Sequence, residues 1–339
     1  MSIKRELEGN INDSIKIILE RGKNYGRSNY GNDRKINIEY GTSADINTIY
    51  GDSLARIMSF IGYDVTREYF VRENAEVIDE IQKELDDIRI NFDLFTKEKD
   101  LYDGGIVDTT LVLLQQSGKC YIDNNNLWLK TTDLFDSEDR LLIKSDGSYA
   151  SFLTDLSYHV CRLKKNYDSI IDIVYDDSIE YFNGIKSGIC FAGYDQNKLK
   201  IIHLSKKNDV NCDDVNKLRY NFISDNLNSV QDNNLICYIE KAYSKICLLL
   251  RGKTYNYSTI GDESAYTILN KLIQFEEIVI EASSGNINII SNYLYELAVL
   301  YYNYEAVMTT NEYINLLFAI KIVMDNAASM LGLILREEM

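Results

Sequence analysis

Residues 36–70, INIEYGTSADINTIYGDSLARIMSFIGYDVTREYF, decide the fold of this chain. The stretch predicts a β-strand over INIEY, a turn through residues 45–50, a helix over GDSLARIMSFIG and a second strand over DVTREYF. The apolar residues of the predicted helix share one face, which favours packing on a sheet; they are Leu54, Ile57, Met58 and Ile61. This order indicates the first β-α-β unit of a nucleotide-binding domain, in which a ligand lies beyond the carboxyl end of the strand.

Strands and helices alternate from residue 36 to about residue 205, which is typical of an α/β domain with a largely parallel sheet. Further strands are predicted at 119–124, 127–132, 140–146, 169–175 and 198–204. Helices are predicted between the strands, near 74–98, 104–116, 155–165 and 178–190. From Asp213 onward the period is helical throughout and indicates a bundle, with helices at 213–224, 231–250, 262–283, 286–307 and 311–332. We therefore expect three parts: an N-terminal helix and loop (1–35), an α/β domain (36–210) and a helical domain (211–339).

The composition is that of a soluble globular protein. Of the 339 residues, 45% are hydrophobic and 26% charged, and no apolar run is long enough for a membrane span. The net charge of −16 argues against DNA and against non-specific binding of nucleic acid, because the field of the protein repels phosphate. The six cysteines show no CxxC spacing and there are only two histidines, so we expect reduced, mostly buried thiols, a cytoplasmic protein and no metal site.

Short motifs along most of the chain resemble one enzyme family. Ser43-Ala44-Asp45, followed by Gly51-Asp52-Ser53-Leu54-Ala55-Arg56, is similar to the start of the catalytic domain of class I arginyl-tRNA synthetases. The other segments that carry the resemblance are 25–29, 127–133, 139–147, 155–159, 292–298 and 331–339. The resemblance implies a Rossmann-like class I synthetase domain with a parallel sheet, followed by an all-α domain of the anticodon-binding type.

The loops that carry the chemistry of this family are reduced or missing. In the family, a loop with the sequence His-Ile-Gly-His separates Ser-Ala-Asn from Gly-Asp-Ser, whereas only residues 46–50 stand there in this chain. A second family loop, Lys-Met-Ser-Lys, has one candidate remnant, Lys206 and Lys207 in HLSKK. In the alternative that we favour, His203 is a strand residue and the second loop is deleted altogether. Such loops stabilise charge on the phosphates of ATP, so their loss predicts weak or absent adenylation of the amino acid.

The resemblance also implies an arginine pocket, in an eroded form. It consists of Glu39, Asp45, Ser151, Asp155 and Ser178. Two carboxylates, Glu39 and Asp155, suit a guanidinium. Other interpretations stay open: Glu39 can be solvated at the end of an exposed strand, and Asp155 can cap a helix. His159 is more typical of a structural histidine than of an acid–base group.

For RNA, the helical domain offers cations interleaved with tyrosines, a combination suited to phosphate contact and base stacking. The candidates for tRNA binding are Lys241, Lys245, Arg251, Lys253 and Tyr255, with Tyr243 and Tyr257 beside them. A solvated helix face explains the lysines nearly as well.

Three functions compete at this stage. The first is a degenerate arginyl-tRNA synthetase paralogue that binds tRNA or a partner protein without efficient adenylation. The second is a working arginine–tRNA ligase, which would use ATP with magnesium, arginine and its tRNA. The third is a structural or regulatory subunit that binds no RNA. None of the three involves a membrane.

Overall fold

The computed structural model describes residues 11–41, 45–72, 77–205, 214–224, 235–255 and 263–338. These residues form two compact units. The described parts of 33–51 and 64–207 make an α/β unit, and those of 1–32, 52–63 and 208–339 make a helical unit. Each unit is described by itself below.

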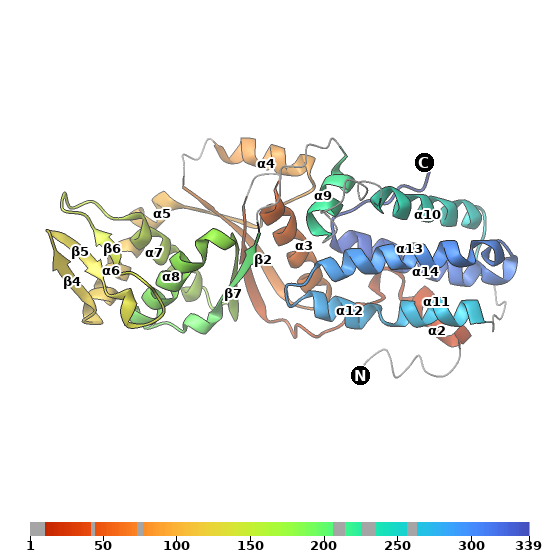
Figure 1. Cartoon of the computed structure of the whole chain (residues 1–339), viewed down its shortest axis with the longest axis horizontal. Helices are drawn as coiled ribbons and strands as arrows, with labels where there is room; N and C mark the ends of the chain where they lie inside the picture. Colours follow the sequence, from red (N-terminus) through yellow and green to blue (C-terminus); the bar gives the residue numbers. More distant parts are fainter. Residues whose placement is uncertain are drawn as a thin grey trace. The chain divides into compact units, whose positions relative to one another are not determined.

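A five-stranded parallel sheet forms the centre of the α/β unit (Figure 1). Its strands are β1 (Lys35–Glu39), β2 (Asp64–Val71), β3 (Leu94–Lys97), β7 (Ser169–Tyr175) and β8 (Leu199–Leu204). The strand order is β3-β2-β1-β7-β8, so the direction of the crossovers reverses between β1 and β7. A reversal of this kind leaves a crevice at the carboxyl ends of the two strands, which is where ligands bind in doubly wound folds. The α/β class predicted from the sequence is confirmed.

The expectation of one helix over 74–98 is wrong. Helix α4 (Val77–Asp87) ends early, and the chain then forms β3. The helix ends because Arg89 adopts a left-handed conformation with φ 63°, while the amide of Ile90 donates to the carbonyl of Leu85 at 2.9 Å. Glycine usually occupies such a position, so an arginine there left no stop signal in the sequence.

A small antiparallel sheet and four further helices complete the α/β unit. The sheet has the order β4 (Cys120–Asp123), β5 (Asn126–Leu129) and β6 (Arg140–Ile143). The tight turn between β4 and β5 is possible because Asn124 and Asn125 both adopt positive φ. The helices are α5 (Glu98–Asp103), α6 (Ile106–Gln116), α7 (Ser151–Lys164) and α8 (Ile179–Phe191).

Helix α3 (Ile46–Phe60) replaces the turn expected at residues 45–50. Asp45 starts the helix, because its Oδ1 accepts hydrogen bonds from the amide and the hydroxyl of Thr48, both at 3.1 Å. Gly51 lies within the helix, and a Cβ there would come within 2.4 Å of the ring of Tyr40. Six residues therefore separate the end of β1 at Glu39 from the start of the helix at Ile46, and the helix passes closely over Tyr40.

The helical unit is a bundle, as the periodicity predicted (Figure 1). Its helices are α2 (Ile11–Arg21), α9 (Val215–Ile223), α10 (Leu235–Leu250), α11 (Glu263–Ile273), α12 (Phe275–Ala282), α13 (Asn288–Met308) and α14 (Ile314–Met330). The single helix expected over 262–283 is broken at Gln274 into α11 and α12. Helix α2 packs on α11 and α14, so the N-terminal segment belongs to this unit.

A buried ion pair lies inside the helical unit. Asp52 accepts hydrogen bonds from Arg56 Nε at 2.7 Å and from Arg219 Nη2 at 2.5 Å. Arg219 also donates from Nε to the carbonyl of Leu331 at 2.7 Å, and a Cβ at Gly332 would clash with its guanidinium. The Gly-Asp-Ser motif therefore has a structural role here through Asp52.

The five cysteines in the described part of the chain are free and half-buried, so the expectation of mostly buried thiols is wrong. Cys212 lies outside the described residues. No helix within the described ranges is long and apolar enough to cross a membrane.

Candidate functional site

Three carboxylates form a row across the middle of the parallel sheet. Glu39 on β1 is in register with Glu68 on β2 on one side and with Asp172 on β7 on the other. Residues in register on parallel strands point to the same face, so the three side chains share one face at the crevice between β1 and β7. The row is the most highly charged feature at the site where the fold favours a ligand.

Helix α7 places three basic side chains against this row. Arg162 is fully buried, contacts Asp172 through Nη1 and donates from Nε to Asn37 Oδ1 at 2.5 Å. His159 lies 2.6 Å from Asp172, and Lys165 lies 3.5 Å from Glu68. These residues are three positions apart along the chain, so their side chains all lie on the side of the helix that covers the sheet.

The histidine of this network is structural, as the sequence indicated. His159 Nδ1 donates to the backbone carbonyl of Asp155 at 2.7 Å, since a carbonyl oxygen can only accept. Its Nε2 faces Asp172, whose pKa burial would raise but which Arg162 and His159 together lower to about 2.

Glu39 differs from its neighbour in its protonation. Its burial and the adjacent Asp172 raise the pKa of the Glu39 carboxyl to about 7, against the opposing charges of Arg162, His159 and Arg72. The expectation that Glu39 ends an exposed strand is wrong, because β1 is the central strand of the sheet and Glu39 is half-buried. At neutral pH, the Glu39 carboxyl is therefore protonated in part of the molecules and ionised in the rest.

Asp155 lies in the second turn of α7, so its expected role as a helix cap is wrong. It forms an ion pair with Arg72, which follows β2, with 2.9 Å between Arg72 Nη2 and Asp155 Oδ1. The hydroxyl of Tyr181, on α8, donates to the other carboxylate oxygen of Asp155. The Arg72 guanidinium carbon also lies 5.4 Å from the centre of the Phe70 ring. An arginine of the chain itself is thus bound to the carboxylate that the resemblance assigns to substrate arginine.

The remaining residues of the expected arginine pocket have other surroundings. Asp45 caps α3 and also accepts a hydrogen bond from the hydroxyl of Tyr175 at 2.9 Å. Ser151 is the exposed first residue of α7, and Ser178 precedes α8 with its hydroxyl 3.4 Å from Asp177. Of the five residues predicted for the pocket, Glu39 and Asp155 are linked by the network around Arg72, while the serines are not part of that network.

The expected second loop cannot be assessed, because Lys206 and Lys207 lie outside the described residues. His203 is an exposed residue of β8, which agrees with its interpretation as a strand residue. Asp176 and Asp177 follow β7 in a short 3-10 turn, and Asp176 accepts from the hydroxyl of Ser205 at 2.6 Å. Within the described ranges, no group of three or more potential ligands is arranged to hold a metal ion.

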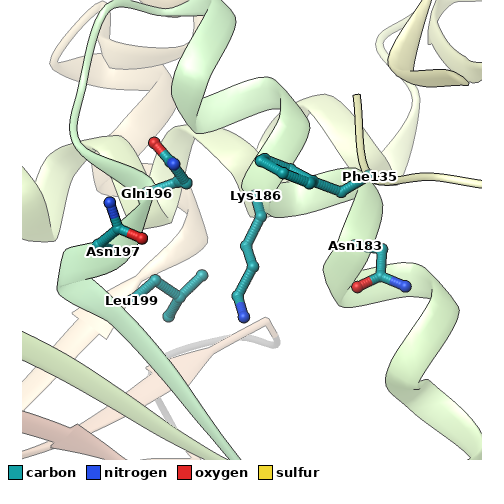
Figure 2. Close-up of a pocket in the computed structure, with 6 residues that line it drawn as sticks. All are labelled: Phe135, Asn183, Lys186, Gln196, Asn197 and Leu199. Carbon is teal, nitrogen blue, oxygen red and sulfur yellow. The ribbon is translucent and has the colours of Figure 1, made fainter. Parts of the chain in front are cut away.

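A pocket of about 340 Å³ lies elsewhere in the α/β unit, at the amino end of β8 (Figure 2). It is lined by Phe135, Asn183, Lys186, Gln196, Asn197 and Leu199. Figure 2 shows the Lys186 side chain extending between Phe135 and Leu199. The pocket contains none of the residues predicted from the sequence.

Most of the cations predicted to bind RNA already contact polar groups of the helical unit. Lys245 Nζ lies 2.8 Å from Glu305, Arg251 pairs with Glu338, and Lys253 Nζ donates to Asn311 at 2.9 Å. Lys241 is exposed on α10. These contacts reduce, but do not remove, the positive charge that this surface presents.

Two of the three tyrosines that accompany these cations can be placed. Tyr243 is only 3% exposed and its hydroxyl donates to Asp325 at 2.6 Å, so its expected role in base stacking is wrong. Tyr255 is 56% exposed, with its ring set edge-on to Phe318. Tyr257 lies outside the described residues.

Sequence reasoning missed the residues that fill the crevice. Arg72, Arg162, Asp172 and Tyr181 come from four different elements, and no short motif joins them. Their proximity follows from the register of β1, β2 and β7 and from the way α7 covers them. The one local signal was an aspartate within the apolar strand SIIDIVY, where a charge is unusual.

Comparisons with known proteins agree with this architecture. Residues 239–339 match the family described as the DALR anticodon binding domain. The chain is 24% identical to the arginine–tRNA ligase of Bacillus subtilis over 453 residues, which cover 96% of this chain and 82% of the relative. Since that span exceeds the 339 residues of this chain, the relative carries long segments that have no counterpart here.

Solved structures show the same fold. A putative arginyl-tRNA synthetase from Campylobacter jejuni superposes with a TM-score of 0.84 at 18% identity, over 97% of this chain and 99% of that one. The arginyl-tRNA synthetase of Thermus thermophilus superposes with a TM-score of 0.78 at 12% identity, over 96% of this chain and 86% of that one.

Proposed function

Because this chain belongs to the arginyl-tRNA synthetase family, we propose that it is a tRNA-binding paralogue of the arginine–tRNA ligases that does not activate arginine. A fold hosts many activities, so the case for lost activity rests on the residues at the site. In this proposal, residues 36–210 keep the catalytic fold without its chemistry, and residues 211–339 supply the RNA-binding part. The protein would act in the cytoplasm.

The observation that carries the proposal is the junction between β1 and α3. Residues 40–45, YGTSAD, are all that separates the strand from the helix. They include no histidine, lysine or arginine, and their one charged residue, Asp45, caps the helix. Adenylation builds negative charge on the α-phosphate of ATP, and this junction offers no positively charged side chain that could stabilise it.

The basic side chains around the carboxylate row do not replace the missing groups. Arg72, His159, Arg162 and Lys165 each contact a carboxylate of the α/β unit. These described side chains do not fit the triphosphate of ATP and its magnesium ion, since binding phosphates would take each of them from its carboxylate, and the pairs of His159 and Arg162 with Asp172 are buried. Loss of one donor of this kind costs ~10²–10³ in rate, and here the resemblance implies that several are absent.

Exchange of labelled pyrophosphate into ATP tests this proposal. We expect the pure protein to show no exchange that depends on arginine, at enzyme concentrations where the Bacillus subtilis ligase exchanges readily. Omission of arginine provides the background for both proteins. Arginine-dependent exchange well above that background would instead establish a working arginine–tRNA ligase.

A further inference from the structure

The contact between Arg72 and Asp155 has the chemistry of ligand recognition. One carboxylate oxygen of Asp155 meets the Arg72 guanidinium at 2.9 Å, and the other accepts from the hydroxyl of Tyr181. Phe70 lies beneath the guanidinium carbon at 5.4 Å and is itself stacked on Tyr158, with 4.3 Å between ring centres. A carboxylate paired with an aromatic face suits a planar guanidinium better than the compact ammonium of lysine.

The two members of the ion pair differ strongly in exposure. The Asp155 side chain is 8% exposed, whereas the Arg72 side chain is 58% exposed. The anion is therefore part of the folded unit, while the cation reaches it from the surface at the end of β2. When Arg72 leaves, its own charge stays solvated, but the buried carboxylate of Asp155 is left without a cation, which is strongly unfavourable until another cation takes its place.

The surroundings of Asp155 favour a replacement cation. Arg72 is the cation that the structure places on Asp155, and its charge also acts on Glu39, in the central strand. Without Arg72, the crevice would hold a buried carboxylate, a tyrosine hydroxyl and an aromatic face, with further acidic charge nearby. A guanidinium compound from solution would restore the lost interactions.

We infer that Arg72 is a built-in occupant of a guanidinium site formed by Asp155, Tyr181 and Phe70, and that it closes this site to free arginine. The inference deepens the proposed function and rests on it, since it assigns the family's substrate class to a site that the chain itself fills. If Arg72 leaves the site in only a small fraction of the molecules, the apparent affinity for free arginine is reduced by that same fraction.

Binding of L-arginine to the full-length protein without ATP tests the inference. Isothermal titration should show at least five- to tenfold tighter binding of arginine to Arg72→Ala than to the unchanged protein. Methylguanidinium should bind to the variant as well, and citrulline, which is similar in shape but uncharged, should not. The matched control is Arg67→Ala, because Arg67 lies on β2, the strand that Arg72 follows, but pairs with Asp93.

Two further variants keep the outcome interpretable. Arg72→Gln serves if Arg72→Ala fails to fold by circular dichroism, and Asp155→Asn in the Arg72→Ala background should abolish the gain in binding. Equal arginine affinity of the unchanged protein and a folded Arg72 variant would overturn the inference, as would a folded variant that binds neither arginine nor methylguanidinium. These readouts need no ATP, so the exchange assay still decides the proposed function separately.

Discussion

Glu39 and Asp172 lie side by side on β1 and β7, yet their carboxyls titrate at opposite ends of the acid range. Arg162 and His159 contact Asp172 directly and lower its pKa to about 2, although its burial acts the other way. Burial and the resulting charge of Asp172 raise the pKa of Glu39 to about 7. The two pKa shifts have one origin, because Arg162 and His159 contact Asp172 directly but do not contact Glu39 in the same way.

Glu39→Gln should remove a specific dependence of stability on pH. A raised pKa means that the folded state holds its proton while the unfolded chain, with an ordinary value near 4.5, releases it. The contribution of Glu39 to stability is therefore full below about pH 4.5 and is lost as the pH rises through 7. We expect the free energy of unfolding of the unchanged protein to fall by roughly 1–3 kcal/mol over this interval relative to Glu39→Gln.

Urea unfolding of both proteins at pH 5 and at pH 8 measures this difference. Glu180→Gln, an exposed substitution on α8, is the control and should keep the pH dependence of the unchanged protein. If Glu39→Gln also keeps it, the carboxyl of Glu39 titrates normally and the account of the carboxylate row is wrong.

Among the elements, α3 shows that the Gly-Asp-Ser motif has structural contacts of its own. Asp52 is buried with Arg219 in the helical unit, and Gly51 packs on Tyr40 in the α/β unit. Both residues of the motif therefore have structural tasks that do not involve a substrate. These contacts explain the presence of the motif whether or not the protein activates an amino acid.

Asp52→Asn should destabilise the protein strongly. The substitution removes the charge that compensates the fully buried Arg219, and an uncompensated buried charge costs about 3–5 kcal/mol. Glu20→Gln, which breaks the exposed pair with Lys16, is the control and should cost less than about 1 kcal/mol. Urea unfolding compares the two, and equal losses would mean that the buried pair contributes no more than a surface pair.

Periodicity and turn residues were sufficient to predict most of these elements, and the exceptions have physical causes. Strands β1, β2 and β7 were located closely because each is a short apolar run beside clear breaks. Strand β3 was missed because the helix before it ends at Arg89, in a conformation that usually requires glycine. The start of α3 was taken for a turn because the capping role of Asp45 depends on Thr48, within a stretch without strong helix formers.

The candidate site was only partly predictable for a different reason. Glu39 and Asp155 were identified through resemblance, but Arg72 gave no signal, since its importance comes from a contact with a residue 83 positions away. Pairwise contacts between β2 and α7 depend on strand order and register, which a single sequence does not encode locally. The contact of Arg72 with Asp155 therefore became visible only in the structure.

At the scale of the whole molecule, a net charge of −16 has to be reconciled with binding of a polyanion. Affinity for RNA would have to come from a local surface, because the overall field repels phosphate. The cations of α10 and its exit are the candidates: Glu305 and Glu338 balance two of them, and Lys253 donates to the uncharged side chain of Asn311. We therefore expect tRNA binding that depends on few phosphate contacts and on recognition of shape and bases.

Replacement of Lys241 and Lys245 by glutamine tests this surface. Gel-shift titration with an arginine tRNA over a series of salt concentrations should show ~10-fold weaker binding by the double variant and a salt slope smaller by about 2, one for each lost phosphate contact. Lys83→Gln with Lys99→Gln makes the same change of charge in the α/β unit and should lower the affinity only slightly. Equal losses for the two double variants would indicate a general field effect rather than a binding surface on α10. Equally weak binding of all RNAs by the unchanged protein would favour a protein partner, because a tRNA-binding role requires a preference that net charge alone cannot produce.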